Sequence, residues 1–257
     1  MESASIQQIA DLELLAHRTW PSRIQESLGP WILRGNDGFT RRANSCLALG
    51  HPGADLESAI DQVESWYRKL GVEPCFKICA GAPDGLDALL ERRGWPVATP
   101  TKVMAIAPTG TRPTSPELHI RLTPDDRWLD HLSRWDGECA TKAKQHAALL
   151  GRVDHARFAS WESGEEILAV GFCAMDGDRG HLYDLVVRQD LRGQGIGTRF
   201  FQSLLDHCYN EGAKQLYLQV LEENRVACRL YHRLGFSEHH RYHYRIAPWS
   251  ASATTGC

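Results

Sequence analysis

The residues with the clearest chemical potential form a glycine-rich turn, RGQGIGT, at 192–198. A hydrophobic segment at 183–187 precedes the turn, and an amphipathic helical pattern follows it. Glycines at 193, 195 and 197 leave backbone N–H groups unscreened, and a helix N-terminus adds unpaired donors and partial positive charge. Arg192 can add a charge-assisted hydrogen bond. The turn is therefore predicted to hold a phosphate or a pyrophosphate.

Other phosphate-binding motifs fit this turn less well. A P-loop needs Lys after its last glycine, whereas Thr198 and Arg199 follow Gly197, so we reject it. A dinucleotide-binding fingerprint needs GxGxxG and opens a βαβ series, whereas here GxGxG follows hairpin-type strands. A glycine-rich turn without a ligand remains an alternative for this segment taken alone.

The elements around the turn alternate in type. Turn residues at 162–164 and 176–178 predict two hairpins, and Gly212 is expected to end the helix after the glycine turn. The resulting order, β-α-β-β-β-α-β-α-β, belongs to the α/β or α+β class. The predicted strands are 119–122, 156–161, 167–175, 181–187, 215–221 and 239–246, and the predicted helices begin near 124, 196 and 224.

The first half of the chain repeats part of this order. A helix at 55–70, a strand, the segment LERRGW at 90–95 and a strand to 106 parallel helix 196–211, a strand, YHRLGF at 231–236 and the last strand. This similarity predicts an internal duplication. Residues 38–45 are expected to form a strand. Three prolines at 108–116 predict a linker, which gives domains at 1–107 and 117–247 and a tail at 248–257.

Two motifs in the second half resemble the signatures of the GNAT N-acetyltransferase superfamily. The first is Val187-x4-Arg192-Gly-x-Gly195-x-Gly197, which is similar to the acetyl-CoA signature. The second is the segment 224–236, with Asn224, Ala227 and Tyr231 in place. The first half carries neither motif, since its turn reads LGHPGA at 49–54. The resemblance implies two GNAT-like acyl-CoA N-acyltransferase domains, each a mixed β-sheet flanked by helices, with a degenerate first domain.

The resemblance also implies roles for the matching residues. Main-chain groups of the strand before the turn would pair with the pantetheine arm of acetyl-CoA, and the turn would hold its pyrophosphate. Asn224 and Ala227 would contact the cofactor arm, and Tyr231 would lie near the thioester sulfur, unless it is only a core aromatic. The implied cofactor-binding residues are Leu185, Val186, Val187, Arg192, Gly193, Gln194, Gly195, Ile196, Gly197, Thr198, Asn224 and Ala227.

A base must take the proton of an amine acceptor. Asp184 and Glu222 lie where such carboxylates often occur in this family, although each could instead be a surface or capping residue. Tyr231 is expected to donate a hydrogen bond to the thiolate that develops on the leaving group. These three residues are the predicted catalytic set.

Composition limits the partners of the protein. The net charge is −3, so no positive field favours nucleic acid. No apolar run approaches the roughly 18 residues of a membrane span, and the start does not resemble a signal peptide, which predicts a cytoplasmic location. The 8 cysteines are expected to be free thiols. His239, His240 and His243 crowd one strand without metal-ligand spacing, so no metal is expected.

The sequence therefore predicts an N-acetyltransferase that moves an acetyl group from acetyl-CoA to a primary amine by direct attack. A small molecule or an amino acid is the expected acceptor. A protein N-terminus or lysine is an alternative acceptor, and a non-catalytic acyl-CoA sensor is an alternative function. The oligomeric state stays open, with a homodimer as one possibility.

Overall fold

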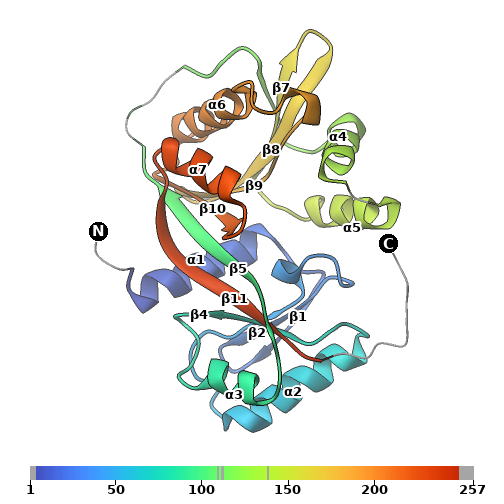
Figure 1. Ribbon diagram of the computed structural model, residues 1–257, viewed down its shortest axis with the longest axis vertical. Coiled ribbons are helices and arrows are strands. Elements are labelled where there is room, and N and C mark those ends of the chain that lie inside the picture. The colour runs from blue at the N-terminus through green and yellow to red at the C-terminus, as the bar shows by residue number, and fades with distance from the viewer. Residues whose placement is uncertain (1–3, 109, 111–112, 138, 249–257) are drawn as a thin grey trace. The chain divides into compact units, whose positions relative to one another are not determined.

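The computed structural model describes residues 4–248, apart from 109, 111–112 and 138. The chain packs into two compact units, each built from separate segments. Unit 1 comprises Met1–Val103, Leu221–Glu223 and His239–Cys257, and unit 2 comprises Met104–Val220 and Asn224–Glu238. Both units combine helices and strands, as predicted for the α/β or α+β class (Figure 1).

In unit 1 the strand order is β1-β2-β3-β4-β11-β5. β3 and β4 are parallel, and β11 is antiparallel to β4, with Tyr242 opposite Cys79 and Ile246 opposite Cys75. The strands are β1 (Ile24–Leu28), β2 (Trp31–Gly35), β3 (Cys46–Leu47), β4 (Cys75–Cys79), β5 (Val97–Ile106) and β11 (Ser237–Ile246), and the helices are α1 (Ile6–Thr19), α2 (Leu56–Lys69) and α3 (Leu86–Arg92).

The pairing of β11 explains why the units differ from the predicted division into 1–107 and 117–247. The last strand forms its ladder with β4, so most of it belongs to unit 1 although it follows all of unit 2 in the chain. The described residues between Ile106 and Leu118 form no helix or strand, in keeping with a linker there. Of the predicted tail at 248–257, the part after Pro248 lies outside the described residues.

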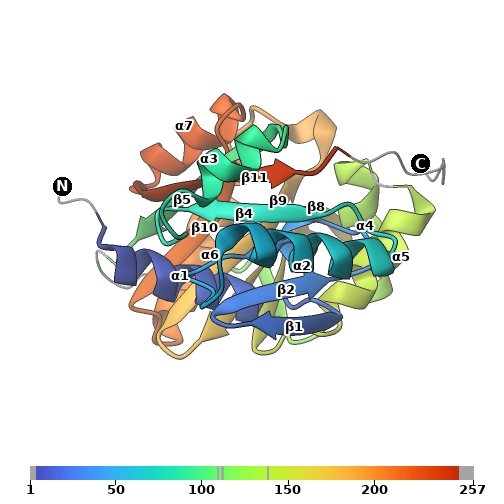
Figure 2. The ribbon, with the colours of Figure 1, turned by 90° about the horizontal axis from the view of Figure 1, so that it is seen from below.

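The two faces of the unit 1 sheet have different chemistry. Phe76 and Ile78 of β4 join the apolar core under α2 and α3, and Figure 2 shows α2 beside β2 and β4. Lys77 points to the opposite face, because side chains alternate along a strand, and it forms an ion pair with Glu13 of α1. His240 of β11 also contacts Glu13, with 2.8 Å between Nε2 and Oε1. All three side chains are buried.

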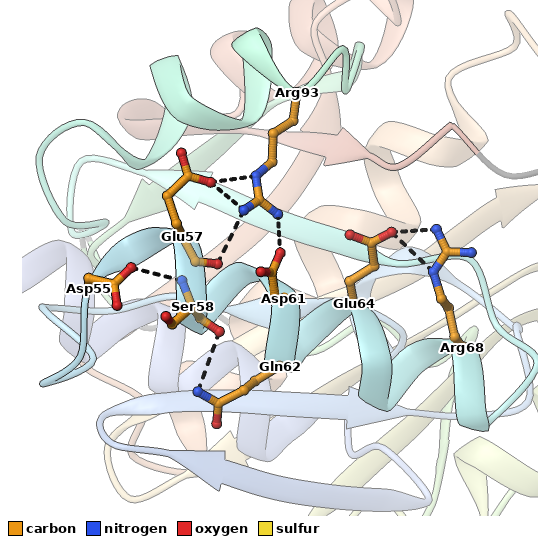
Figure 3. Close-up of polar contacts among 8 residues, drawn as sticks. All are labelled: Asp55, Glu57, Ser58, Asp61, Gln62, Glu64, Arg68 and Arg93. Carbon is orange, nitrogen blue, oxygen red and sulfur yellow. Dashed lines mark hydrogen bonds and ion pairs between the residues drawn. The ribbon is translucent and has the colours of Figure 1, made fainter.

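The outer face of α2 is charged, and it is tied to the end of α3 (Figure 3). Asp55 caps α2 by accepting a hydrogen bond from the Ser58 backbone N–H at 2.9 Å. Arg93, just after α3, donates from Nε to Glu57 at 2.9 Å and from Nη1 to Asp61 at 2.6 Å. These contacts stay on the surface of unit 1.

In unit 2 the strand order is β10-β9-β8-β7-β6, with β10 parallel to β9 and the other pairs antiparallel. The strands are β6 (Leu118–Arg121), β7 (Ala156–Ser163), β8 (Glu166–Asp176), β9 (Arg179–Val187) and β10 (Gln215–Leu221), and the helices are α4 (Asp126–Asp136), α5 (Ala140–Leu150), α6 (Ile196–Asn210) and α7 (Arg225–Arg233).

Helices cover both faces of the unit 2 sheet (Figure 1). Ala159 of β7 joins the core that α6 fills with Phe200, Phe201 and Leu204. Its neighbour Phe158 points the other way and packs edge-on against Trp128 of α4, with 5.2 Å between ring centroids. Among the described helices, none is long and apolar enough to cross a membrane.

Most predicted elements are confirmed, but residues 38–45 do not form a strand: Thr40 has a φ of +57° and a short 3-10 helix spans Arg41–Ala43. The sequence prediction also missed α1, the strands β1 to β3 and α5. The start of α5 at Cys139 has no side-chain cap. The seven cysteines of the described residues are free thiols, as expected.

Candidate functional site

The predicted glycine turn connects β9 to α6 through a short 3-10 helix, Gln189–Leu191. Gly193 and Gly195 have φ values of +80° and +81°, which L-residues rarely adopt. Gly195 is the N-cap of α6, and no side chain caps this helix. A Cβ atom on Gly197 would lie 3.2 Å from Cγ2 of Val187. Glycine at these positions therefore keeps the backbone donors at the start of α6 accessible.

A cavity of about 700 Å³ lies beside this turn and is large enough for a small ligand. We call it the glycine-turn cavity, and it lies entirely within unit 2. Val226 lines it with 71% of its surface exposed, which leaves an apolar wall for a ligand to cover. Its lining residues are Trp135, Leu185, Val186, Val187, Leu191, Arg192, Gly193, Gly195, Gly197, Thr198, Phe200, Phe201, Asn224, Val226, Ala227, Leu230, Tyr231 and Arg233.

The end of β9 offers its backbone to this cavity. The parallel register of β9 and β10 runs from Arg179 opposite Gln215 to Leu182 opposite Leu218, whereas β9 itself continues to Val187. On its other side β9 stays paired to β8, with Val186 opposite Val170. Main-chain groups of 185–187 on the β10 side can thus pair with an extended ligand, as an added strand would.

Asp184 occupies a strained position at the start of this open segment. Its φ is +51°, and the β8–β9 register shifts between Val170 and Phe172. Its Oδ2 atom lies 2.8 Å from Nε2 of His146, which α5 supplies. The side chains of His146 and Asp184 are 6% and 12% exposed, so the pair is nearly shielded from solvent. Strain of this kind persists only where surrounding contacts enforce it.

Tyr231 lies on α7 with its ring 5.3 Å from that of Phe201. Burial, followed by the nearby Cys228 thiol, raises the pKa of its phenol to about 12. The hydroxyl therefore stays protonated at neutral pH and can donate a hydrogen bond into the glycine-turn cavity.

Other predicted residues have more local roles. Asn224 lines the cavity, but its Oδ1 accepts from the Ala227 N–H at 3.1 Å and so caps α7, leaving the amide NH₂ for a ligand. Arg192 donates from Nε to the Val187 carbonyl at 3.1 Å. Gln194 and Ile196 do not line the cavity in the part of the chain that is described: Gln194 bonds the Asp190 carbonyl, and Ile196 packs in the core.

Glu222 belongs to unit 1, and it is not among the described residues that line the glycine-turn cavity. Its carboxylate lies 3.0 Å from Nη1 of Arg241 in the same unit. This ion pair gives Glu222 a structural partner, and its catalytic role stays a prediction.

The sequence prediction missed two residues of this region. His146 was missed because α5 was missed, and Trp135 carries no motif that marks it as part of a site. Of the histidines that crowd the last strand, His240 contacts Glu13 at 2.8 Å and His243 contacts Asp87 at 2.9 Å. Within the described ranges, no group of three or more potential ligand side chains gathers as a metal site would require.

Acetyl-CoA fits the residues that are present. The uncapped start of α6 suits a pyrophosphate, the unpaired end of β9 suits the amide-rich pantetheine arm, and Tyr231 can face a leaving thiolate. The chemistry of the lining thus agrees with the ligand that the sequence motifs imply.

The chain is similar to known N-acetyltransferases. A family model described as "Probable histone acetyltransferase Rv0428c C-terminal" matches residues 6–245. The "Uncharacterized N-acetyltransferase YobR" of Bacillus subtilis is 31% identical over 246 residues, covering 93% of this chain and 98% of that protein. The ribosomal protein bS18-alanine N-acetyltransferase of Escherichia coli is 34% identical over 61 residues, covering 24% of this chain and 41% of that protein.

Solved structures share the fold over nearly the whole chain. A GCN5-related N-acetyltransferase from Kribbella flavida has a TM-score of 0.68 at 14% identity and covers 97% of this chain and 98% of its own. A tandem GNAT protein from the clavulanic acid biosynthesis pathway has a TM-score of 0.59 at 13% identity, covering 94% and 89%.

Proposed function

The chain belongs to the GNAT family of N-acetyltransferases, and from this premise we propose that it transfers the acetyl group of acetyl-CoA to the primary amine of a small molecule or an amino acid. The observation that carries the proposal is the glycine-turn cavity, in which the uncapped start of α6, the open end of β9 and Tyr231 line one space. Acetyl-CoA supplies the activated acetyl group as a thioester.

Binding is assigned to backbone groups. The N–H groups of Gly193, Gly195 and Gly197, together with Thr198, hold the pyrophosphate, and the main chain of 185–187 pairs with the pantetheine arm. The exposed Val226 gives the adenosine end an apolar contact.

Proton transfer is assigned to Asp184 and His146 on one side and to Tyr231 on the other. A lysine-like amine needs about 4.6 kcal/mol to be neutral at pH 7, and an α-amine about 1.4 kcal/mol, so a proton acceptor is required. Asp184 accepts that proton directly or through water, and the 2.8 Å contact with His146 fixes its carboxylate. Tyr231 donates a hydrogen bond to the sulfur as charge develops there.

Direct attack by the amine needs no acetylated enzyme. In the lining of the glycine-turn cavity, among the residues described, no cysteine or serine supplies a nucleophile. The proposed transfer takes place in one step between the two substrates, which the site holds next to each other.

A protein amine is the second candidate acceptor. It is supported by the matching family, which is described as a probable histone acetyltransferase, and by the Escherichia coli relative that acts on alanine of ribosomal protein bS18. The second match covers only 24% of this chain, so it carries less weight for the acceptor.

Thiol release from acetyl-CoA, followed with a panel of amines, tests the proposal. The panel contains amino acids, aliphatic and aromatic amines, an alanine-starting peptide and a lysine-containing histone-tail peptide. Turnover with free amines and little with peptides is the expected result. Turnover with peptides alone would move the function to protein acetylation, and acetyl-CoA binding without any turnover would support a sensor.

A further inference from the structure

A second cavity of about 520 Å³ lies in unit 2, beside α6 at the edge of the apolar core. Gln202, Leu205, Asp206 and Tyr209 of α6 line it. These positions recur at intervals of three and four residues, which places them on one face of the helix. Gln215 at the start of β10, Arg233 at the end of α7 and Ser237 at the start of β11 complete the walls. We call this space the α6 cavity.

The carboxylate in this cavity is buried and forms no ion pair with any described residue, although Arg233 lines the same cavity. Asp206 is only 6% exposed. Its Oδ1 atom accepts a hydrogen bond from Nε2 of Gln202 at 3.2 Å, and in the described part of the chain no ion pair reaches it. Burying an ionised carboxylate without a positive partner is costly, so such groups normally pair with a cation or bind one.

The phenol one helical turn further along points to the same conclusion. Tyr209 is 8% exposed, and its hydroxyl has no hydrogen-bond partner among the residues described. Burial raises the pKa of this phenol, so the hydroxyl keeps its proton and can both donate and accept. A buried polar group without a partner calls for a bound molecule or ordered water.

From these two groups we propose that the α6 cavity is a binding site for a small organic ammonium compound that also carries a hydroxyl or carbonyl oxygen. The ammonium group pairs with Asp206, and the oxygen bonds the Tyr209 hydroxyl. Gln202 holds the carboxylate in place for this contact. A volume of about 520 Å³ accommodates a molecule of amino-acid size together with water.

This site differs from the one proposed for acetyl-CoA, although Arg233 lines both cavities. The residues of the α6 cavity that carry the argument, Asp206 and Tyr209, are absent from the lining of the glycine-turn cavity in the described chain. The inference therefore does not rest on the proposed function, and either can fail alone.

Two probes that differ in one group test the site. 5-Aminopentan-1-ol carries an ammonium and a hydroxyl, and pentane-1,5-diol replaces the ammonium with a second hydroxyl at nearly the same shape. Binding of both is measured by calorimetry on the full chain without acetyl-CoA, with the thermal midpoint recorded in parallel. The amine is expected to bind and to raise the midpoint, whereas the diol does neither.

Variants assign the binding to the cavity. Asp206→Asn is expected to weaken binding of the amine at least about tenfold, because a charge-assisted contact is lost. Tyr209→Phe is expected to weaken it about threefold to tenfold, because a neutral hydrogen bond is lost. Glu165→Gln removes the same charge from an exposed position of unit 2 and is expected to leave binding unchanged.

Three outcomes would overturn the proposal. They are equal binding of the amine and the diol, unchanged binding in Asp206→Asn, and no binding of the amine to a wild-type protein that is folded. The last result would mean that the α6 cavity holds water only. If Asp206→Asn fails to fold, Tyr209→Phe decides, since its hydroxyl has no protein partner to lose.

Discussion

Helix α2 of unit 1 and helix α6 of unit 2 occupy equivalent positions in the two repeats, but their N-termini are capped differently. α2 of unit 1 starts at Asp55, whose carboxylate accepts from the Ser58 N–H at 2.9 Å and so occupies the helix N-terminus (Figure 3). α6 of unit 2 starts at Gly195, without a side-chain cap. A helix that caps itself has fewer donors to offer a ligand, whereas an uncapped helix leaves these donors to water or to a bound anion.

Helices α3 and α7, which come second in the two repeats, also differ in the polar groups that they carry. Both end in a glycine with positive φ followed by a buried aromatic: Trp95 N–H bonds the Leu90 carbonyl at 3.0 Å, and Phe236 N–H bonds the Tyr231 carbonyl at 3.0 Å. The backbone is thus alike, but Leu90 stands where Tyr231 supplies a phenol. Unit 1 has kept the scaffold without the polar groups that unit 2 can use for transfer.

In unit 1, the charged or titratable side chains of Glu13, Lys77 and His240 form a buried network. The largest effect that we predict is for Lys77→Met, which leaves Glu13 with His240 alone and should lower the stability by about 3–5 kcal/mol. Chemical denaturation measures this loss. Arg68→Met removes a cation from an exposed pair with Glu64 and should cost less than about 1 kcal/mol. Similar losses for both variants would contradict the account of unit 1.

The same network sets a pH window. Burial alone would raise the pKa of Glu13, but Lys77 and His240 outweigh it and lower the pKa to about 2 from its ordinary 4.5. Its stabilising contribution is therefore complete above pH 4.5 and is lost as the pH falls toward 2. Denaturation at stepwise lower pH should show this loss in the wild type, and Glu13→Gln should remove that part of the pH dependence. An unchanged pH dependence in Glu13→Gln would count against the network.

In unit 2 the strongest predicted effect is on turnover. Tyr231→Phe should lower kcat by about 100-fold while the Kd of acetyl-CoA stays the same, because the lost hydroxyl acts as charge develops on sulfur. Steady-state kinetics and calorimetry separate the two quantities. Tyr244→Phe removes a buried hydroxyl of β11 that lines neither cavity in the described chain and should leave kcat near the wild-type value. A fall in affinity in place of kcat would make Tyr231 a binding residue.

His146→Gln should give a smaller loss, about tenfold in kcat/KM at neutral pH, since it acts by positioning Asp184. A purely structural role would lower the rate equally at all pH values. We expect instead that the acid limb of the kcat/KM profile moves. His207→Gln, near the far end of α6, is the matched control and should keep the wild-type profile. Parallel profiles for all three proteins would exclude His146 from proton transfer.

The smallest effect concerns the cap of α2. Asp55→Ala removes its hydrogen bond to the Ser58 N–H and should lower the thermal midpoint by about 2–4 °C without changing the Kd of acetyl-CoA. Differential scanning calorimetry detects such a shift. A change in acetyl-CoA affinity would contradict the claim that only the start of α6, and not that of α2, serves the ligand.

Sequence patterns predicted the parts of this molecule that depend on local physics. Helices α2 and α6 carry apolar stripes with helical spacing, and the hairpin turns at Gly164 and Gly177 carry glycines in the left-handed region. The glycine turn was identified because its residues are contiguous. Helix α5 escaped prediction because its sequence, ATKAKQHAALL, has a weak apolar stripe and no capping side chain.

The features that escaped the sequence depend on contacts between distant segments. His146 meets Asp184 across 38 positions, and β11 joins β4 across more than 160. No local pattern encodes either partner, and the positive φ of Asp184 is imposed by the shifted register of its strand. The units therefore divide the chain differently from the proline-rich boundary, although the order of elements in both repeats was predicted correctly.

Acetyl-CoA binding to Gly195→Glu tests the central claim most directly. The new carboxylate would lie at the uncapped start of α6, where it repels a pyrophosphate and crowds it. Gly164→Glu is the matched control, because Gly164 also has positive φ with open space around it but lies in the β7–β8 hairpin. We predict that the wild type and Gly164→Glu bind acetyl-CoA alike by calorimetry and that Gly195→Glu loses at least about 100-fold in affinity. Equal affinities for all three proteins, or no binding by the wild type, would contradict the account.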